Sequence, residues 1–193
     1  LMIDAYSVGY RILGDTSYLE AAVGAADFIL QNMVDEADGL MRISREGRVT
    51  KVAYQEDYAF LIQGLVSLSE ASGRRVYLTA AQDLATKMEE LFWDSKSGGF
   101  YFTSSGEGLI TRTKNPHDSA MPSGNSAAVN ALLRLYETSN DKSALDLAEN
   151  TLQTFLPAAR RAPGAYLFLI LGAHKYLALS DKREVSVYGA RKP

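Results

Sequence analysis

The stretch EDYAFLIQGLVSLSEASGRRVYLTAAQDLATKMEEL, from Glu56 to Leu91, contains two helical patterns separated by a short polar link. The first pattern is apolar on almost every side, whereas the second has one apolar stripe at helical spacing and polar residues elsewhere. The two patterns therefore predict a helix that is buried on all sides, followed by a helix with one solvent-exposed face. The link SGRR is short enough to force the two helices to lie antiparallel.

Similar pairs occur before and after this stretch, which indicates a repeat of helical hairpins. Leu19, Leu78 and Leu145 hold equivalent positions in the half-exposed helices, and the links GDTS and SNDK resemble SGRR in length. The covered helices are predicted at Met2–Leu13, Glu56–Ala71, Gly124–Thr138 and Ala165–Leu179, and the half-exposed ones at Thr16–Leu30, Arg75–Leu91 and Lys142–Leu156. Covered and half-exposed helices in alternation predict an all-α fold with two nested layers, part of an α/α toroid over residues 1–179.

Two long connections join the pairs, at Val34–Tyr54 and Trp93–Met121, and both contain glycine-flanked stretches that favour small β-hairpins. Because all short links lie at one end of the array, the long connections deliver the chain to the starts of the covered helices. We therefore expect one common mouth. Its polar residues are predicted to be Asp4, Glu56, Asp57, His117, Asp118, Ser123 and Asn125.

Composition excludes several classes of function. The chain of 193 residues has a net charge of −3 and no basic block, which disfavours nucleic-acid binding. There is no cysteine, so disulfides and thiolate metal sites are excluded, and the two histidines lack ligand spacing. The longest apolar run is too short to span a membrane. We expect no metal, no cofactor and a cytoplasmic location. Since Leu1 already lies in a helical pattern, we also expect the chain to be a piece of a longer protein.

Four titratable residues at the predicted mouth are candidates for proton transfer. Glu56 and Asp57 open a covered helix, where acids complement the helix dipole but also suit general acid or base chemistry on a sugar. His117 is a loop histidine that either faces solvent or moves protons. Asp118 is either a second catalytic carboxylate or a residue that caps the loop.

The run DSAMPSGNS precedes the helix that starts near Gly124, and it offers capping and ligand-binding groups together. Ser123 is a good N-cap and Pro122 is tolerated beside it. Asn125 and Ser126 are poor helix formers once that cap is filled. Asn125 therefore either fixes the loop or contacts a ligand, and Ser126 is kept as a further binding candidate.

Aromatic and basic residues in the second long connection suggest substrate binding. Trp93 and Tyr101 either stack on a sugar ring or pack a hairpin against the end of the helices. Arg112 either attracts an anionic substrate or is ordinary surface charge.

Three motifs in order, EDYAFLIQGLVSLSEASG, LFWDSKSGGFYFT and DSAMPSGNSAAVNALLRL, resemble the C-terminal part of the thioredoxin-domain-containing spermatogenesis-associated family. Asp57 falls in its D-Y-A motif and Asp118 in its D-x-A-x-P-S-G-N-S motif. The resemblance implies about three and a half hairpins of an (α/α)6 toroid like that of N-acylglucosamine 2-epimerases and six-hairpin glycosidases. It also implies a tail at 180–193 with a strand-like segment, REVSVYG. The family's thioredoxin-like domain has no counterpart here.

Two functions follow as expectations. The first is a carbohydrate-related domain, epimerase-like or glycosidase-like, whose reaction the family does not define. The second is a non-catalytic scaffold of helical repeats. Because covered helices at the ends of a partial ring expose apolar surface, we expect the chain to self-associate or to pack on the rest of a longer parent protein.

Overall fold

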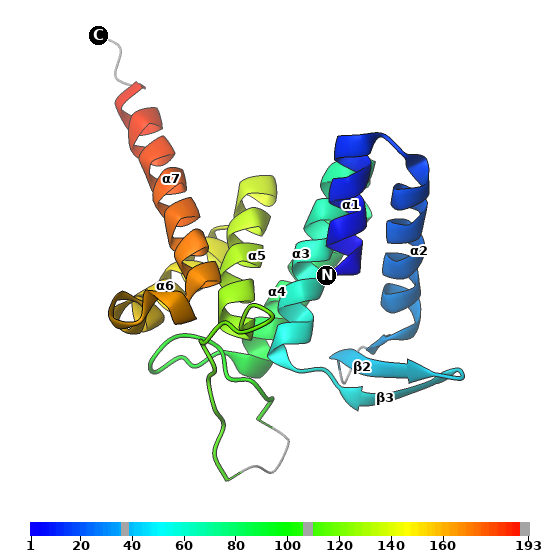
Figure 1. The fold of residues 1–193 in the computed structure, drawn as a ribbon, viewed down its shortest axis with the longest axis horizontal. Coiled ribbons are helices and arrows are strands. Elements are labelled where there is room, and N and C mark those ends of the chain that lie inside the picture. Colours follow the sequence, from blue (N-terminus) through cyan, green and yellow to red (C-terminus); the bar gives the residue numbers. More distant parts are fainter. Residues whose placement is uncertain (36–38, 106–109, 190–193) are drawn as a thin grey trace.

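A computed structural model describes residues 1–35, 39–105 and 110–189 of the chain. Within these ranges the fold is a row of antiparallel helical hairpins with a small antiparallel sheet (Figure 1), which confirms the predicted fold class. The helices are α1 (Met2–Leu13), α2 (Thr16–Asn32), α3 (Gln55–Ser72), α4 (Arg75–Phe92), α5 (Gly124–Ser139), α6 (Lys142–Arg161) and α7 (Leu167–Gly189), with a short 3-10 turn at Pro163–Ala165.

The helices form two layers, as the two hydrophobic patterns predicted. α1, α3, α5 and α7 pack in that order as neighbours in the inner layer, and α2, α4 and α6 pack on the outside as their antiparallel partners. α3 and α5 hold the centre of the core, where large side chains such as Tyr58 and Leu132 are fully buried. α4 and α6 contribute apolar stripes and keep polar residues on their outer faces.

The short links reverse the chain through left-handed residues at the helix ends. Gly14 and Gly73 end α1 and α3 with φ angles of 74° and 69°, a region that glycine enters without steric cost. Asp15 then caps the start of α2 by accepting a hydrogen bond from the backbone N–H of Ser17 at 2.9 Å. Residues within the short links thus set the antiparallel arrangement of the helices that they join.

The first long connection forms the predicted hairpin. β2 (Gly39–Arg45) pairs with β3 (Arg48–Val52), and β1 (Val34–Asp35) adds a third, short strand on the other side of β2. The second connection has only an isolated bridge between Trp93 and Phe100 in residues 93–105 and 110–121. The backbone N–H of Phe102 donates to the carbonyl of Thr113 at 2.8 Å, but no strand forms in these residues, and positions 106–109 lie outside the described residues, so the second hairpin stays a prediction.

The C-terminal helix differs from the sequence-based expectation. α7 remains helical through residues 183–189, for which a strand was predicted, so that prediction is wrong. Positions 190–193 of the predicted tail lie outside the described residues, and a division of the chain at residue 180 stays a prediction. None of the described helices is both long enough and apolar enough to cross a membrane.

Both ends of the row expose apolar side chains. On α1, Val8 and Ile12 are 38% and 75% exposed, and on α7, Leu167 and Leu171 are 62% and 60% exposed. Each pair is one helical turn apart, so each forms a stripe along its helix. The inner helices at the centre of the row have no such stripe, because neighbours cover them on both sides.

Candidate functional site

The starts of α3 and α5 lie side by side and form a common rim, as the connectivity predicted. The Gln55 side chain, 1% exposed, donates a hydrogen bond of 3.1 Å from Nε2 to the backbone carbonyl of Gly124. A methyl group at Gly124 would collide with Oε1 of Gln55. Glycine at the first position of α5 therefore lets the two helix starts approach each other closely.

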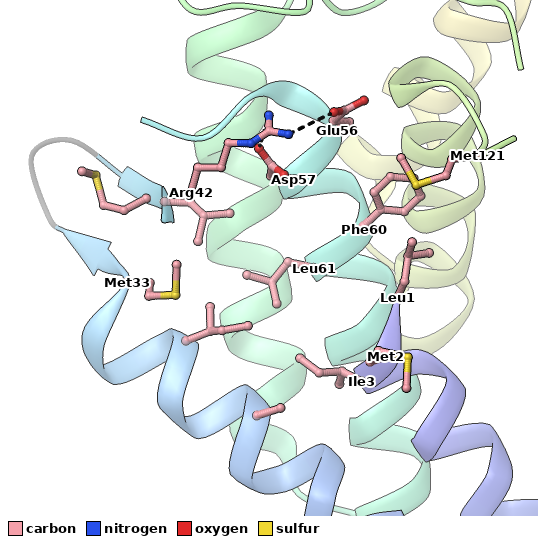
Figure 2. A pocket seen from close by; sticks show the side chains of 14 residues that line it. Leu1, Met2, Ile3, Met33, Arg42, Glu56, Asp57, Phe60, Leu61 and Met121 are labelled. Carbon is pink, nitrogen blue, oxygen red and sulfur yellow. Dashed lines mark ion pairs between the residues drawn. The ribbon is translucent and has the colours of Figure 1, made fainter. Parts of the chain in front are cut away.

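Glu56 and Asp57 stand on this rim and share one cation. Arg42, on β2, lies 3.8 Å from Oε1 of Glu56 and 3.3 Å from Oδ2 of Asp57 (Figure 2). Asp57 also accepts a hydrogen bond of 2.9 Å from the backbone N–H of Tyr54, which caps the start of α3. Asp57 is thus fixed by the fold, whereas Glu56 has only the longer ion pair among the residues that the structure describes.

The electrostatic surroundings of Glu56 make its proton harder to remove. Burial raises the pKa of Glu56, the negative charge of Asp57 raises it further, and Arg42 acts in the opposite direction. A carboxyl group with a raised pKa holds a proton nearer to neutral pH, which suits general acid catalysis.

Two hollows adjoin Glu56. The larger, of about 440 Å³, lies between α1, α2, β2 and α3 (Figure 2), and its lining is apolar apart from Arg42, Glu56 and Asp57. The smaller, of about 90 Å³, is polar and brings four of the predicted site residues together: Glu56, His117, Ser123 and Asn125. We call them the apolar cavity and the polar recess. Glu56 and Met121 line both.

The two loop residues His117 and Asp118 have different environments. His117 is exposed at the polar recess, and its Nε2 lies 2.9 Å from the hydroxyl oxygen of Tyr166. Asp118 instead accepts hydrogen bonds from the backbone N–H groups of Ser123, at 2.9 Å, and Phe168, at 2.8 Å. Asp118 therefore joins the starts of α5 and α7, and the structure favours the loop-capping alternative for it.

The polar residues at the start of α5 are bonded within the fold. Ser123 is the N-cap, as predicted, and accepts a hydrogen bond of 3.1 Å from the backbone N–H of Ser126. The side-chain amide of Asn125 pairs with both backbone groups of Phe100, at 2.8 Å to its N–H and 3.0 Å to its carbonyl. Ser126 is fully buried. These contacts favour loop fixing over ligand binding for Asn125 and Ser126.

The aromatic and basic candidates of the second connection pack against the fold and line neither hollow. The ring of Trp93 meets Phe100 edge to face at 5.0 Å. Arg112 stacks on the Tyr101 ring at 4.2 Å, and its guanidinium donates to the carbonyls of Thr103 and Leu91. This geometry favours the packing alternative for all three predicted residues.

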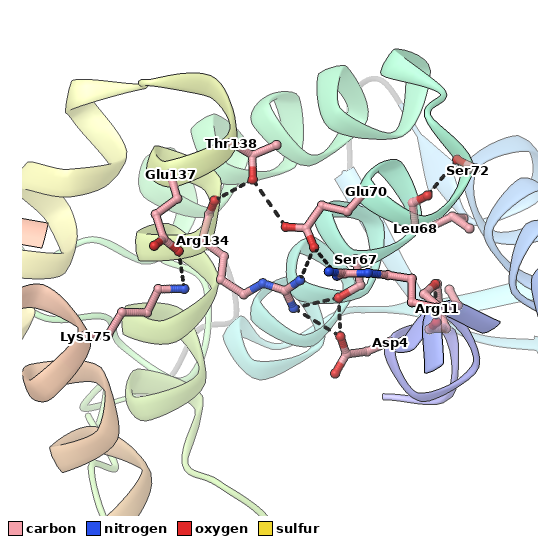
Figure 3. Close-up of polar contacts among 12 residues, drawn as sticks. Asp4, Arg11, Ser67, Leu68, Glu70, Ser72, Arg134, Glu137, Thr138 and Lys175 are labelled. Carbon is pink, nitrogen blue, oxygen red and sulfur yellow. Dashed lines mark hydrogen bonds and ion pairs between the residues drawn. The ribbon is translucent and has the colours of Figure 1, made fainter. Parts of the chain in front are cut away.

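Asp4, predicted at the mouth, lies elsewhere. α1 begins level with the middle of α3, since Ile3 packs against Gly64. Asp4 therefore contacts Ser67 and Gln63, and it pairs with Arg134 of α5 at 3.3 Å (Figure 3). It belongs to a polar cluster that joins three inner helices, and its predicted place at the rim is wrong.

Sequence reasoning missed three residues at the site: Arg42, Phe60 and Met121. Arg42 lies in a short alternating strand, a pattern that indicates which side a residue faces but not which partner it reaches across the chain. Met121 lies inside the DSAMPSGNS run and was passed over for its polar neighbours. In the described ranges no group of three His, Asp or Glu residues is placed to hold a metal ion.

Comparisons with known proteins agree with this fold. The family model for N-acylglucosamine 2-epimerase matches residues 2–166. Human spermatogenesis-associated protein 20 is 35% identical over 176 residues, which are 86% of this chain and 22% of that protein. The chain thus spans about a fifth of this relative's length.

Solved structures of known proteins have the same fold. Cellobiose 2-epimerase from Spirochaeta thermophila matches with a TM-score of 0.66 and 21% identity, over 80% of this chain and 41% of that one. Unsaturated glucuronyl hydrolase from Bacillus sp. GL1 matches with a TM-score of 0.59 and 16% identity, over 79% and 44%. At these identities the likeness shows the fold. With the family model covering most of its length, the chain belongs to the N-acylglucosamine 2-epimerase family.

Proposed function

We propose that this domain binds a carbohydrate at the rim between α3 and α5, with Glu56 transferring a proton in an epimerase-like or glycosidase-like reaction. The observation that carries the proposal is the position of Glu56. Its carboxyl group, with a raised pKa, stands between the polar recess and the apolar cavity. The fold of this family and the sugar enzymes with the same architecture support the substrate class.

The roles divide between the residues that adjoin the recess. Glu56 supplies or removes the proton, and Arg42 modulates its charge. His117, exposed beside it, is a second group able to accept or donate a proton. Ser123 and Asn125 shape the recess wall while their polar atoms serve the fold. A cytoplasmic location is part of the same proposal and rests on the absence of cysteine.

The proposal is tested by titrating mono- and disaccharides against the chain by calorimetry, followed by chromatography for epimerised or hydrolysed products. We expect at least one sugar to bind the native protein and to lose at least about tenfold in affinity or rate with Glu56→Gln. Glu90→Gln is the matched control, because Glu90 is an exposed carboxylate on α4 paired with Lys87. Equal behaviour of both variants would remove Glu56 from the mechanism.

A scaffold function is favoured by a different observation, the apolar stripes on α1 and α7. For the chain on its own, we propose that a second copy covers these stripes, with α7 of one copy against α1 of the next. Neighbouring inner helices already pack in this way, as Val129 does against Gly172 between α5 and α7. In a longer parent protein, further hairpins would take that place. Sedimentation velocity should show a dimer or larger species that Ile12→Lys dissociates, and a monomer at high concentration would contradict the idea.

A further inference from the structure

We propose that the carbohydrate bound at Glu56 carries an apolar substituent, such as an alkyl or aryl group, which lies in the apolar cavity. This inference rests on the proposed function and extends it from a sugar in general to a glycoside with an apolar group. The geometry that points to it is the pair of unlike hollows that meet at Glu56 and Met121.

The polar recess holds only part of a ligand. Small-molecule pockets usually measure about 300–1,000 Å³, and the recess has about 90 Å³. The apolar cavity, with about 440 Å³, lies inside the usual range. A molecule with a hydroxyl group near Glu56 therefore has most of its available space on the side of the apolar cavity.

The walls of the apolar cavity suit a hydrocarbon group and offer little to a sugar ring. Apolar side chains approach from four elements, among them Ile3, Ile29, Leu40, Phe60 and Leu61. The charged side chains of the lining are those of Arg42, Glu56 and Asp57, which lie together at one edge (Figure 2). Sugar hydroxyls placed deeper would lose their hydrogen bonds with water and gain none, which is unfavourable.

The edge of the apolar cavity favours a neutral head group. Two carboxylates, on Glu56 and Asp57, face the single guanidinium of Arg42, so the three groups together carry a net negative charge when ionised. Arg42 is held further by its position 4.5 Å from the centre of the Tyr54 ring. An anionic ligand would meet a cation that is already paired, whereas uncharged hydroxyls can accept from Arg42 and donate to Glu56.

Methionine side chains allow the apolar cavity to adjust to substituents of different shape. Met33, Met41 and Met121 come from separate segments of the chain and all line it. Unbranched thioether side chains repack around varied ligands more easily than branched ones. We therefore expect tolerance for the shape of the apolar group and a steady gain in affinity with its size.

Calorimetry with methyl, butyl and hexyl glucosides and mannosides, kept below micelle formation, tests the inference on the native chain. Each buried methylene should tighten binding about fourfold, so hexyl glycosides should bind at least about tenfold tighter than methyl glycosides. In Ala25→Leu the new side chain enters the apolar cavity and should remove this gain without changing the affinity for the methyl glycoside. Ala21→Leu is the control, one turn away on the same exposed face of α2 and outside the lining.

The outcomes separate this inference from the proposed function. Equal binding of methyl and hexyl glycosides would overturn the inference and leave the sugar site standing, as would a hexyl gain that persists in Ala25→Leu. Hexanol binding as tightly as the hexyl glycosides would show that the sugar contributes nothing, and both ideas would fail. Absence of binding by every glycoside would also overturn both.

Discussion

The connection from α2 to α3 and the connection from α4 to α5 both bring the chain to the same rim, yet their polar side chains are used differently. Along the second connection and at the start of α5, the side chains of Arg112, Asp118 and Asn125 hydrogen-bond to backbone groups of the fold. Where the first connection enters α3, Glu56 has an ion pair of 3.8 Å with Arg42 and lines two hollows.

The difference teaches how to distinguish structural from functional polar residues at this rim. A side chain whose donors and acceptors are all bonded stabilises the fold and has nothing left for a ligand. A partly buried carboxyl group with incomplete pairing costs stability, and such groups gather at functional sites. Variants in the second connection should therefore damage folding, whereas a variant at Glu56 should leave the fold intact.

The largest effect is expected for Asn125→Ala. Removing the amide leaves the N–H and the carbonyl of the buried Phe100 without their partners, which should lower the free energy of unfolding by about 3 kcal/mol. Urea denaturation followed by circular dichroism measures it. Asn150→Ala removes an exposed amide on α6 and should change stability by less than about 0.5 kcal/mol. Similar losses of stability in both variants would show that the hydrogen bonds between Asn125 and Phe100 stabilise the fold no more than an exposed amide does.

A smaller loss is expected for Gly124→Ala at the contact between α3 and α5. The added methyl would meet Gln55, which is buried and bonded to Gly124, and would lie 3.3 Å from Cβ of Glu56. Overpacking of this kind costs about 2 kcal/mol. Gly24→Ala is the control, since nothing lies within 4 Å of the new methyl on α2, and better helix propensity should raise stability by about 0.5–1 kcal/mol. No change in stability for Gly124→Ala would mean that the starts of α3 and α5 can move apart to accommodate the methyl group.

How far the sequence predicts this molecule depends on the range of the interactions involved. The bounds of α1 to α5 came out within two residues, because hydrophobic spacing and short links act locally, whereas α6 and α7 continue five and ten residues beyond their predicted ends. The strand-like segment that the family resemblance implied at 183–189 is helical instead, and the β-branched residues Val185 and Val187 do not prevent this, because their preference for strands is weak.

The site required contacts that a single sequence does not display. Glu56 and Asp57 were found from their place at a helix start. Arg42 was missed because its partners lie 14 and 15 residues away, across a hairpin. The amide of Asn125 bonds Phe100 across 25 residues, and without that contact loop fixing and ligand binding remained equal alternatives.

Acid should weaken the second connection selectively, through Asp94. Lys114 at 2.6 Å, with the hydroxyl of Ser97 and the N–H of Lys96, holds the pKa of Asp94 well below its usual range. A carboxylate with a lowered pKa stabilises the fold above its unfolded pKa, near 3.9, and that stability is lost as the pH falls further. Asp94→Asn should therefore be less stable than the native chain at pH 7, with a difference that shrinks below about pH 4. A difference constant with pH would contradict this.

The smallest change in stability is expected for Glu56→Gln, and it is an increase where the variants above, their controls apart, lose stability. Because burial and Asp57 raise its pKa above the ordinary 4.5, ionised Glu56 costs stability at neutral pH. That cost is present above the raised pKa and disappears as the pH falls below 4.5. Glu56→Gln should thus be slightly more stable than the native chain at pH 7 and equal to it near pH 4. Asp57→Ala, one residue away, loses the capping hydrogen bond from the Tyr54 N–H and should be about 1 kcal/mol less stable. If urea denaturation at the two pH values showed Glu56→Gln to be destabilised like its neighbour, Glu56 would be a structural residue too, and the contrast between the two connections would vanish.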